Sequence, residues 1–444
     1  MQTIADLFPY FEVQFTKEGV VNDQAEVDQL LDFLAQGEVT DILVVAHGWN
    51  NDMKEARALY QELFGHVRDE INGDKPSGIA ARKFAVFGIL WPSKKFADED
   101  DIPSGAASLA APEADSAELI AQLEELKGFF DNNDDDALLS RAQELVPRLE
   151  DDPAAANEFA DLIRSLPGIE EKHAEDNSER FFTISSEELM DIMSRPDIAA
   201  APEPGMGGAA GFNPGIGDAG GALGIKDFLG GLLAGARKVL NFTTYFQMKG
   251  RAGAVGRIGV SEILKRIRQR VPDIKIHLIG HSFGGRVVTS AANALDGSQQ
   301  TRPSTLTLLQ AAFSHNGFAQ KFDGKRDGFF REVVTMEKVS GPIIITHSVQ
   351  DRAVGIAYPI ASKLSDDDSA GLGGPDDRFG GIGRNGAQHT PESDDGSPLG
   401  PNDCVYSFQA GKIYNLNADS IIQGHSDIRR SEVAHALLCA IATT

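Results

Sequence analysis

Four short apolar runs, separated by stretches with helical spacing, constrain the fold of this chain more than any other feature. The runs are DILVVA, KFAVFGIL, IKIHLIG and PIIIT, and segments such as MKEARALYQELFGHV and VSEILKRIRQRV between them have the periodicity of amphipathic helices. Strands that lack polar alternation are typical of a parallel sheet covered by helices on both faces. The sequence therefore predicts an α/β fold with a mostly parallel sheet.

The strand and helix pattern is interrupted twice. The chain has 444 residues, enough for one large domain with insertions or for two ordinary domains. Residues 93–224 are acidic and rich in alanine, contain several short helical patterns, and end in a Gly/Pro-rich tether. Residues 365–403 form a Gly/Asp-rich loop. We predict one core made of residues 1–92, 225–364 and 404–444, with a helical insertion or cap at 93–224. Further strands are expected at FEVQF, TLTLLQAAF, CVYSFQ and KIYNLN, and a last helix at SEVAHALLCAIA.

Composition excludes some classes of function. The chain has 66 acidic and 41 basic residues, a net charge of -25, which repels nucleic-acid phosphates and anionic lipids. A solvated acidic surface and adaptation to high salt both remain open as its cause. The two cysteines, Cys404 and Cys439, have no zinc-ligand spacing and suggest a reducing compartment, with one disulfide left open. No signal peptide or spanning apolar run is recognised, so we expect a cytoplasmic protein of undefined oligomeric state.

One serine lies in a turn that suits a nucleophile. Gly280-His281-Ser282-Phe283-Gly284 follows a predicted strand and precedes a predicted helix. Such a turn holds the serine in a strained conformation and exposes its hydroxyl, while glycine on either side avoids steric overlap. The helix N-terminus directs backbone N–H groups toward the site. In a typical turn of this kind the side chain of His281 points away from the hydroxyl.

A serine nucleophile needs a base and an acid that orients the base. Asp351 follows the strand PIIIT, and His425 lies between the last strand and the last helix. Both follow the carboxyl end of a predicted strand, where open α/β sheets gather their sites. Alternatives stay open: His315 as the base, and Asp427 or Asp323 as the acid.

The motifs GHSFGG, AHGWNN, HSVQDRAVG and GHSD resemble those of the α/β-hydrolase superfamily, in particular its serine esterases and lipases. The resemblance covers most of the chain outside residues 93–224 and 365–403. It implies a triad in the order Ser282, Asp351, His425. It also implies an oxyanion hole formed by the backbone N–H groups of Phe283 and Trp49, with Gly48 as an alternative to Trp49, and a structural role for His47.

The resemblance implies hydrolysis of a small-molecule or lipid ester through an acyl-enzyme, which needs no cofactor and no metal. The acidic charge and the lack of a spanning apolar run lead us to expect no nucleic-acid partner and no stable membrane insertion. Acyl transfer, peptide cleavage by the same triad, and a non-catalytic binding scaffold are the alternatives. The helical pattern at 225–240 is interpreted as a buried core helix, with a mobile lid as the alternative. The acidic segment SDDDSAGLGGPDDRFGG is interpreted as a surface loop, with calcium binding as the alternative.

Overall fold

A computed structural model describes residues 2–49, 51–93, 116–132, 134–168, 172–195, 231–298, 300–351, 378–394 and 396–444. The tether at 201–221, the first part of the predicted helix at 225–240, and residues 365–377 of the acidic segment lie outside these ranges. Within them, no helix is both long and apolar enough to cross a lipid bilayer.

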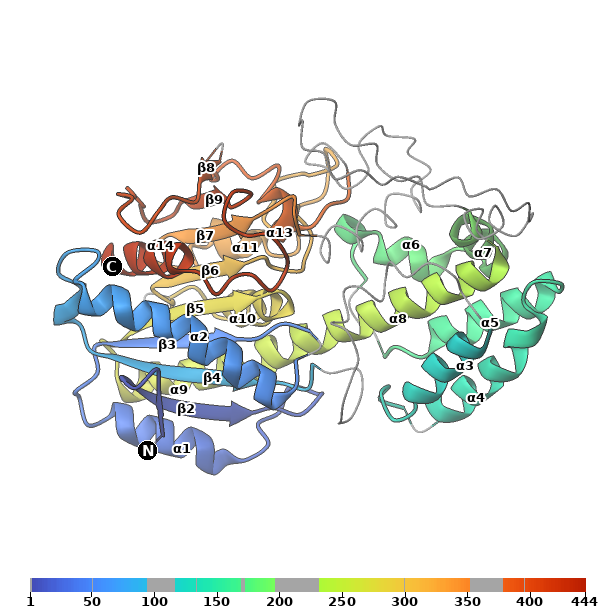
Figure 1. Ribbon diagram of the computed structural model, residues 1–444, viewed down its shortest axis with the longest axis horizontal. Coiled ribbons are helices and arrows are strands. Elements are labelled where there is room, and N and C mark those ends of the chain that lie inside the picture. Colours follow the sequence, from blue (N-terminus) through green and yellow to red (C-terminus); the bar gives the residue numbers. More distant parts are fainter. Residues whose placement is uncertain are drawn as a thin grey trace, which may run out of the picture.

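A nine-stranded sheet forms the centre of the molecule, in the order β1-β2-β4-β3-β5-β6-β7-β9-β8 (Figure 1). Its first strand pairs antiparallel with the second, and all other neighbours are parallel. The prediction of an α/β fold with a mostly parallel sheet is therefore confirmed. The strands are β1 (Gln2–Ile4), β2 (Phe8–Gln14), β3 (Asp41–Ala46), β4 (Phe84–Leu90), β5 (Lys275–His281), β6 (Thr305–Leu309), β7 (Ile343–His347), β8 (Ser397–Pro398) and β9 (Ile413–Asn417).

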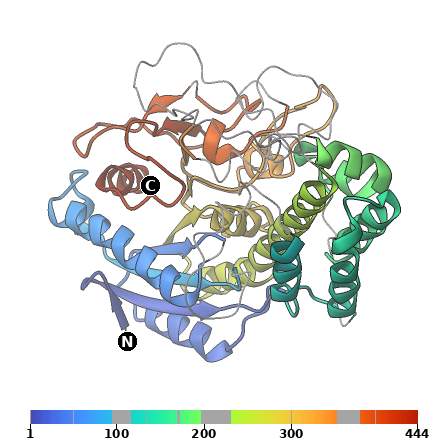
Figure 2. The same cartoon turned by 45° about the vertical axis from the view of Figure 1, so that its right-hand side comes forward.

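Helices cover both faces of the sheet, because the central strands are apolar on both sides. In β3, the side chains of Ile42 and Val44 belong to one hydrophobic cluster, and those of Leu43 and Val45 to the other. The first cluster takes in α1 (Gln24–Leu34), α9 (Ser261–Arg270) and α10 (Phe283–Asn293). The second takes in α2 (Met53–Asn72) and α14 (Ser431–Ala442), which pack against each other (Figure 2).

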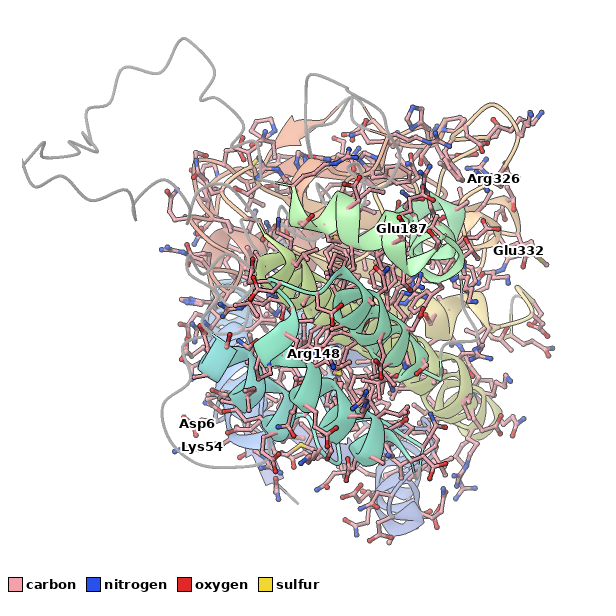
Figure 3. The ribbon with its side chains drawn as sticks, turned by 90° about the vertical axis from the view of Figure 1, so that its right-hand side faces the viewer. Asp6, Lys54, Arg148, Glu187, Arg326 and Glu332 are labelled. Atoms are coloured by element: carbon pink, nitrogen blue, oxygen red, sulfur yellow. The ribbon has the colours of Figure 1, made fainter. Side chains whose placement is uncertain are left out.

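The described part of the insertion is helical and lies beyond the carboxyl ends of the parallel strands (Figure 1). In Figure 3, seen from this side, its helices lie in front of the sheet, with Arg148 and Glu187 labelled on it. Its elements are α3 (Ser116–Glu125), α4 (Asp135–Leu145), η3 (Val146–Arg148), α5 (Pro153–Ser165), η4 (Ala174–Asp176), α6 (Ser178–Thr183) and α7 (Ser186–Ser194). The insertion therefore faces the edge of the sheet at which α/β proteins gather their sites.

One long helix joins the insertion to the core. Helix α8 (Leu232–Ala254) packs against α5 and α7 at one end and against α10 at the other. A π-helical turn, η5 (Val255–Val260), connects it to α9. Helix α8 is buried along most of its length, and the described part of the predicted helix at 225–240 packs against the insertion.

A buried cluster of charges fastens η4 to the core. Lys249 on α8 forms an ion pair with Asp176, and both side chains are about 5% exposed or less. The main-chain oxygen of Glu175 accepts a hydrogen bond from Ser314 Oγ at 3.0 Å, and a carboxylate oxygen of Glu175 accepts one from the backbone N–H of Phe329 at 2.6 Å. These bonds connect the insertion to the loops that follow β6.

The pKa of Glu175 makes stability depend on pH. Burial, and then the neighbouring negative charge of Asp176, raise this pKa from 4.5 to about 7, against the opposing effects of the hydrogen bond from the Phe329 N–H and of the charges of Lys249 and Arg286. Between pH 4.5 and about pH 7, Glu175 loses its proton in the unfolded chain but keeps it in the folded chain, so the free energy of unfolding falls as the pH rises. We expect Glu175→Gln to gain stability relative to the wild type between pH 5 and pH 8, by on the order of 2–3 kcal/mol.

Urea unfolding of both proteins at the two pH values measures this difference. Glu187→Gln, at an exposed position of α7, is the control and should follow the wild type. An unchanged gap between Glu175→Gln and the wild type at pH 5 and pH 8 would contradict the prediction.

Two expectations for the C-terminal part are wrong. The segment CVYSFQ, residues 404–409, is not a strand: the rings of Tyr406 and Phe408 stack on each other at 4.8 Å within a loop. Their alternation with polar residues reflects this packing rather than strand pairing. The second wrong expectation concerns residues 365–403, for which the sequence predicts a loop throughout but which contain the two-residue strand β8. The short strand β1 has no clear sequence pattern.

Candidate active site

Ser282 lies in the sharp turn between β5 and α10. Its backbone has φ 55° and ψ -125°, a left-handed φ that non-glycine residues rarely adopt. The N–H of Ser282 donates to the carbonyl of Leu309, and its own carbonyl accepts from Ala312 N at 2.9 Å, so neighbouring chain segments hold the strained turn in place. Such strain is typical of functional sites.

Close packing explains the glycines of the turn. A Cβ atom at Gly280 would overlap the carbonyl oxygen of Gly284, as the sequence suggests. At Gly284 itself the crowding has another source, because a Cβ atom there would overlap the carbonyl oxygen of Ala46 at the end of β3. The turn therefore packs directly against the loop that follows β3.

The side chains of Ser282, His425 and Asp351 form a continuous hydrogen-bonded chain. His425 Nε2 lies 2.8 Å from Ser282 Oγ, and His425 Nδ1 lies 2.8 Å from Asp351 Oδ2. Asp351 is fully buried after β7, and His425 lies in the loop between β9 and α14. The carboxylate accepts a hydrogen bond from Nδ1–H, so the proton of the neutral ring stays on Nδ1 and Nε2 is left to accept the serine proton. His425 lies 143 positions after Ser282 and 74 positions after Asp351 along the chain. The three residues nevertheless meet at one edge of the sheet.

The alternative base and acids lie elsewhere. His315 Nδ1 pairs with Asn385 at 3.1 Å and makes no hydrogen bond to Ser282 among the described residues. Asp323 binds the backbone N–H and the guanidinium of Arg326. Asp427 accepts a hydrogen bond from Gln423 N and forms an ion pair with Arg430, bonds that stay within the loop that carries His425.

The loop after β3 approaches the serine closely. A Cβ atom at Gly48 would lie only 2.7 Å from Ser282 Cβ, so no larger residue fits there without movement. The rings of Trp49 and Phe283 pack edge to face at 5.8 Å. Phe283 is the first residue of α10, and the first N–H groups of a helix have no acceptor inside the helix. Within the described residues we find no acceptor for the backbone N–H of either Trp49 or Phe283.

The buried side chain of His47 links the loop after β3 to Trp91, the residue that follows β4. Its Nδ1 lies 3.0 Å from the carbonyl of Gly48, and its Nε2 accepts a hydrogen bond from the backbone N–H of Trp91 at 3.3 Å. The indole N–H of Trp91 in turn donates to the carbonyl of His47 at 3.0 Å. Burial lowers the pKa of His47 to about 4, which keeps the ring neutral. These contacts agree with a structural role.

His281 is a residue of the site to which the sequence pattern assigns no function. His281 Nε2 lies 2.9 Å from the carbonyl oxygen of His425, and the two imidazole rings are 4.9 Å apart. No sequence pattern signals this contact, because its acceptor is a backbone group.

No family model, curated protein or solved structure matches this chain. The arrangement of Ser282, His425 and Asp351 is therefore the observation that bears on function. A serine hydroxyl hydrogen-bonded to an imidazole that a buried carboxylate orients is equipped for nucleophilic attack on a carbonyl carbon.

Proposed function

We propose that this chain is a serine hydrolase of α/β-hydrolase architecture that cleaves carboxylic esters through an acyl-enzyme. The chain of hydrogen bonds from Ser282 through His425 to Asp351 is the observation that carries the proposal. Two further features support the architecture: the strained serine between a strand and a helix, and the order of the three residues along the chain. The substrate class is a small-molecule or lipid ester.

In the first half of the proposed reaction, Ser282 Oγ attacks the carbonyl carbon while its proton passes to His425 Nε2. Asp351 holds the ring and stabilises the imidazolium. The backbone N–H groups of Phe283 and Trp49 stabilise the oxyanion, with Gly48 as the alternative to Trp49. When the carbon–oxygen bond to the alcohol breaks, Nε2 returns the proton to the leaving oxygen, and the acyl group stays on Ser282.

In the second half, water attacks the acyl carbonyl while His425 takes its proton. The bond to Ser282 Oγ breaks, the proton returns to this oxygen, and the carboxylic acid leaves. Apart from substrate and water, the groups named in these steps are side chains and backbone groups of the chain.

A fluorophosphonate probe tests the proposal directly, since it phosphonylates a serine only where the hydroxyl is activated. Intact-protein and peptide mass spectrometry should find one adduct per chain, on Ser282. Ser290→Ala is a matched control. Ser290 is a buried serine on α10, the helix that begins directly after Ser282, and its hydroxyl has no hydrogen-bond partner in the described residues. This variant should react like the wild type. An unreactive wild type, or an adduct on another residue, would contradict the proposal.

A further inference from the structure

His281 contacts the loop that carries the proposed base. The residue ends β5 directly before Ser282, and only 3% of it is exposed. Its Nε2 lies 2.9 Å from the carbonyl oxygen of His425. Since a carbonyl oxygen can only accept, the proton of the His281 ring is on Nε2.

The other edge of the same ring faces the loop after β3. Because Nε2 carries the proton, Nδ1 has a lone pair, and this buried atom has no hydrogen-bond partner among the described residues. A Cβ atom at Gly48 would lie 3.1 Å from Nδ1, so the ring edge lies against the backbone of this loop. Burial, and next the neighbouring His425 ring, lower the pKa of His281 to about 3, so the ring stays neutral beside a base that must accept a proton.

The loop of His425 has few other connections to the serine turn. Besides the bond from His425 Nδ1 to Asp351, its hydrogen bonds to the segment after β7 include Ser348 Oγ donating to the carbonyl of Ile422 at 3.2 Å and Val349 N donating to Asp419 at 2.8 Å. In the described part of the chain, no other hydrogen bond joins the backbone of residues 419–430 to residues 280–285. Among the described residues, the bond from His281 is therefore the one hydrogen bond that directly joins the main chain around the base to the serine turn.

We propose that His281 is a positioning residue that holds the backbone of His425 at the distance from Ser282 that proton transfer requires. The proposal rests on the proposed function, since it concerns the geometry of the same reaction. A hydrogen bond from Nε2 to a carbonyl, rather than the bulk of the ring, supplies the effect. Loss of this bond lets the imidazole of His425 move, and displacements of about 1 Å at a reacting group can lower rates about 100-fold.

Two amide variants separate the bond from the general effects of substitution. The amide N–H of glutamine reaches as far along the side chain as Nε2, while the shorter asparagine cannot reach the carbonyl of His425. We expect His281→Asn to lower kcat for a p-nitrophenyl ester about 100-fold with little change in KM. His281→Gln should recover kcat to within about tenfold of the wild type. Rates are expressed per competent site, counted by fluorophosphonate titration, so that partial unfolding does not enter kcat.

His435→Asn provides the matched control. His435 is also a buried histidine whose Nε2 lies 2.9 Å from a backbone carbonyl, that of Cys404, but it lies on α14. This variant should keep the wild-type kcat. Wild-type kcat in His281→Asn, or equal losses in His281→Asn and His281→Gln, would overturn the positioning role while leaving the proposed function intact. A wild-type protein that neither turns over esters nor reacts with the probe would overturn both.

Discussion

The Ser282→Ala variant is expected to lose about six orders of magnitude in kcat for p-nitrophenyl esters. The reason is that the hydroxyl 2.8 Å from His425 Nε2 is the only part of the proposed site that forms a covalent bond to the acyl group. Without it, the remaining oxyanion donors and the binding surface still accelerate attack by water to some extent, by about 10³–10⁴-fold over the uncatalysed rate. Initial rates over a wide range of enzyme concentrations measure the loss.

The fold should survive this substitution, because alanine keeps the backbone bonds of the turn and removes a single oxygen. Circular dichroism and urea unfolding serve as checks, and Ser290→Ala should hydrolyse the ester at the wild-type rate. Hydrolysis by Ser282→Ala at the wild-type rate would assign the activity to another group.

The Asp351→Asn variant is expected to lower kcat by about 10⁴-fold while leaving the geometry of the site in place. The carboxylate accepts a hydrogen bond from His425 Nδ1–H at 2.8 Å, which keeps the ring proton on Nδ1 and leaves Nε2 free to act as a base. An amide N–H in the same place favours the opposite tautomer, with the proton on Nε2, where the ring can no longer accept one from Ser282. It also removes the charge that stabilises the imidazolium.

Pre-steady-state measurement of acylation follows this effect most directly. Asp323→Asn replaces another acid, whose hydrogen bonds among the described residues go to Lys325 and Arg326, and this variant should keep the wild-type rate. If Asp351→Asn acylated as fast as the wild type, the imidazole would have to be oriented by some other group.

The central strands can be predicted from the sequence because burial on both faces leaves an unbroken apolar run, as in β3 and β4. Edge elements lack this signal: β8 has two residues, both exposed, and the alternation around Tyr406 and Phe408 arises from two stacked rings in a loop. Helix α8 reaches Ala254 rather than Leu240. Its second half buries polar residues such as Thr243, Gln247 and Lys249, so polar positions there do not mark a solvent-exposed face and give no periodic pattern.

In the candidate site, too, some features can be predicted from the sequence and others cannot. Ser282, Asp351 and His425 can be proposed from the sequence, since each follows the carboxyl end of a predicted strand. The strands before Ser282 and Asp351 have strong apolar patterns, while the strand before His425 alternates. Their distances cannot, because they depend on the path of three separate loops. The contact of His281 with the carbonyl of His425 leaves no mark in the sequence at all, since any residue at 425 would offer the same acceptor.

The insertion cannot be treated as a removable module. A shortened protein that joined residue 92 to residue 231 would deprive the ammonium of Lys249 of its counter-ion, Asp176. It would also uncover the face of α8 that packs against α5 and α7. Exchange or shuffling of this segment between proteins would thus have to carry α8 along with it, and the smallest transferable unit extends from residue 93 to the end of that helix.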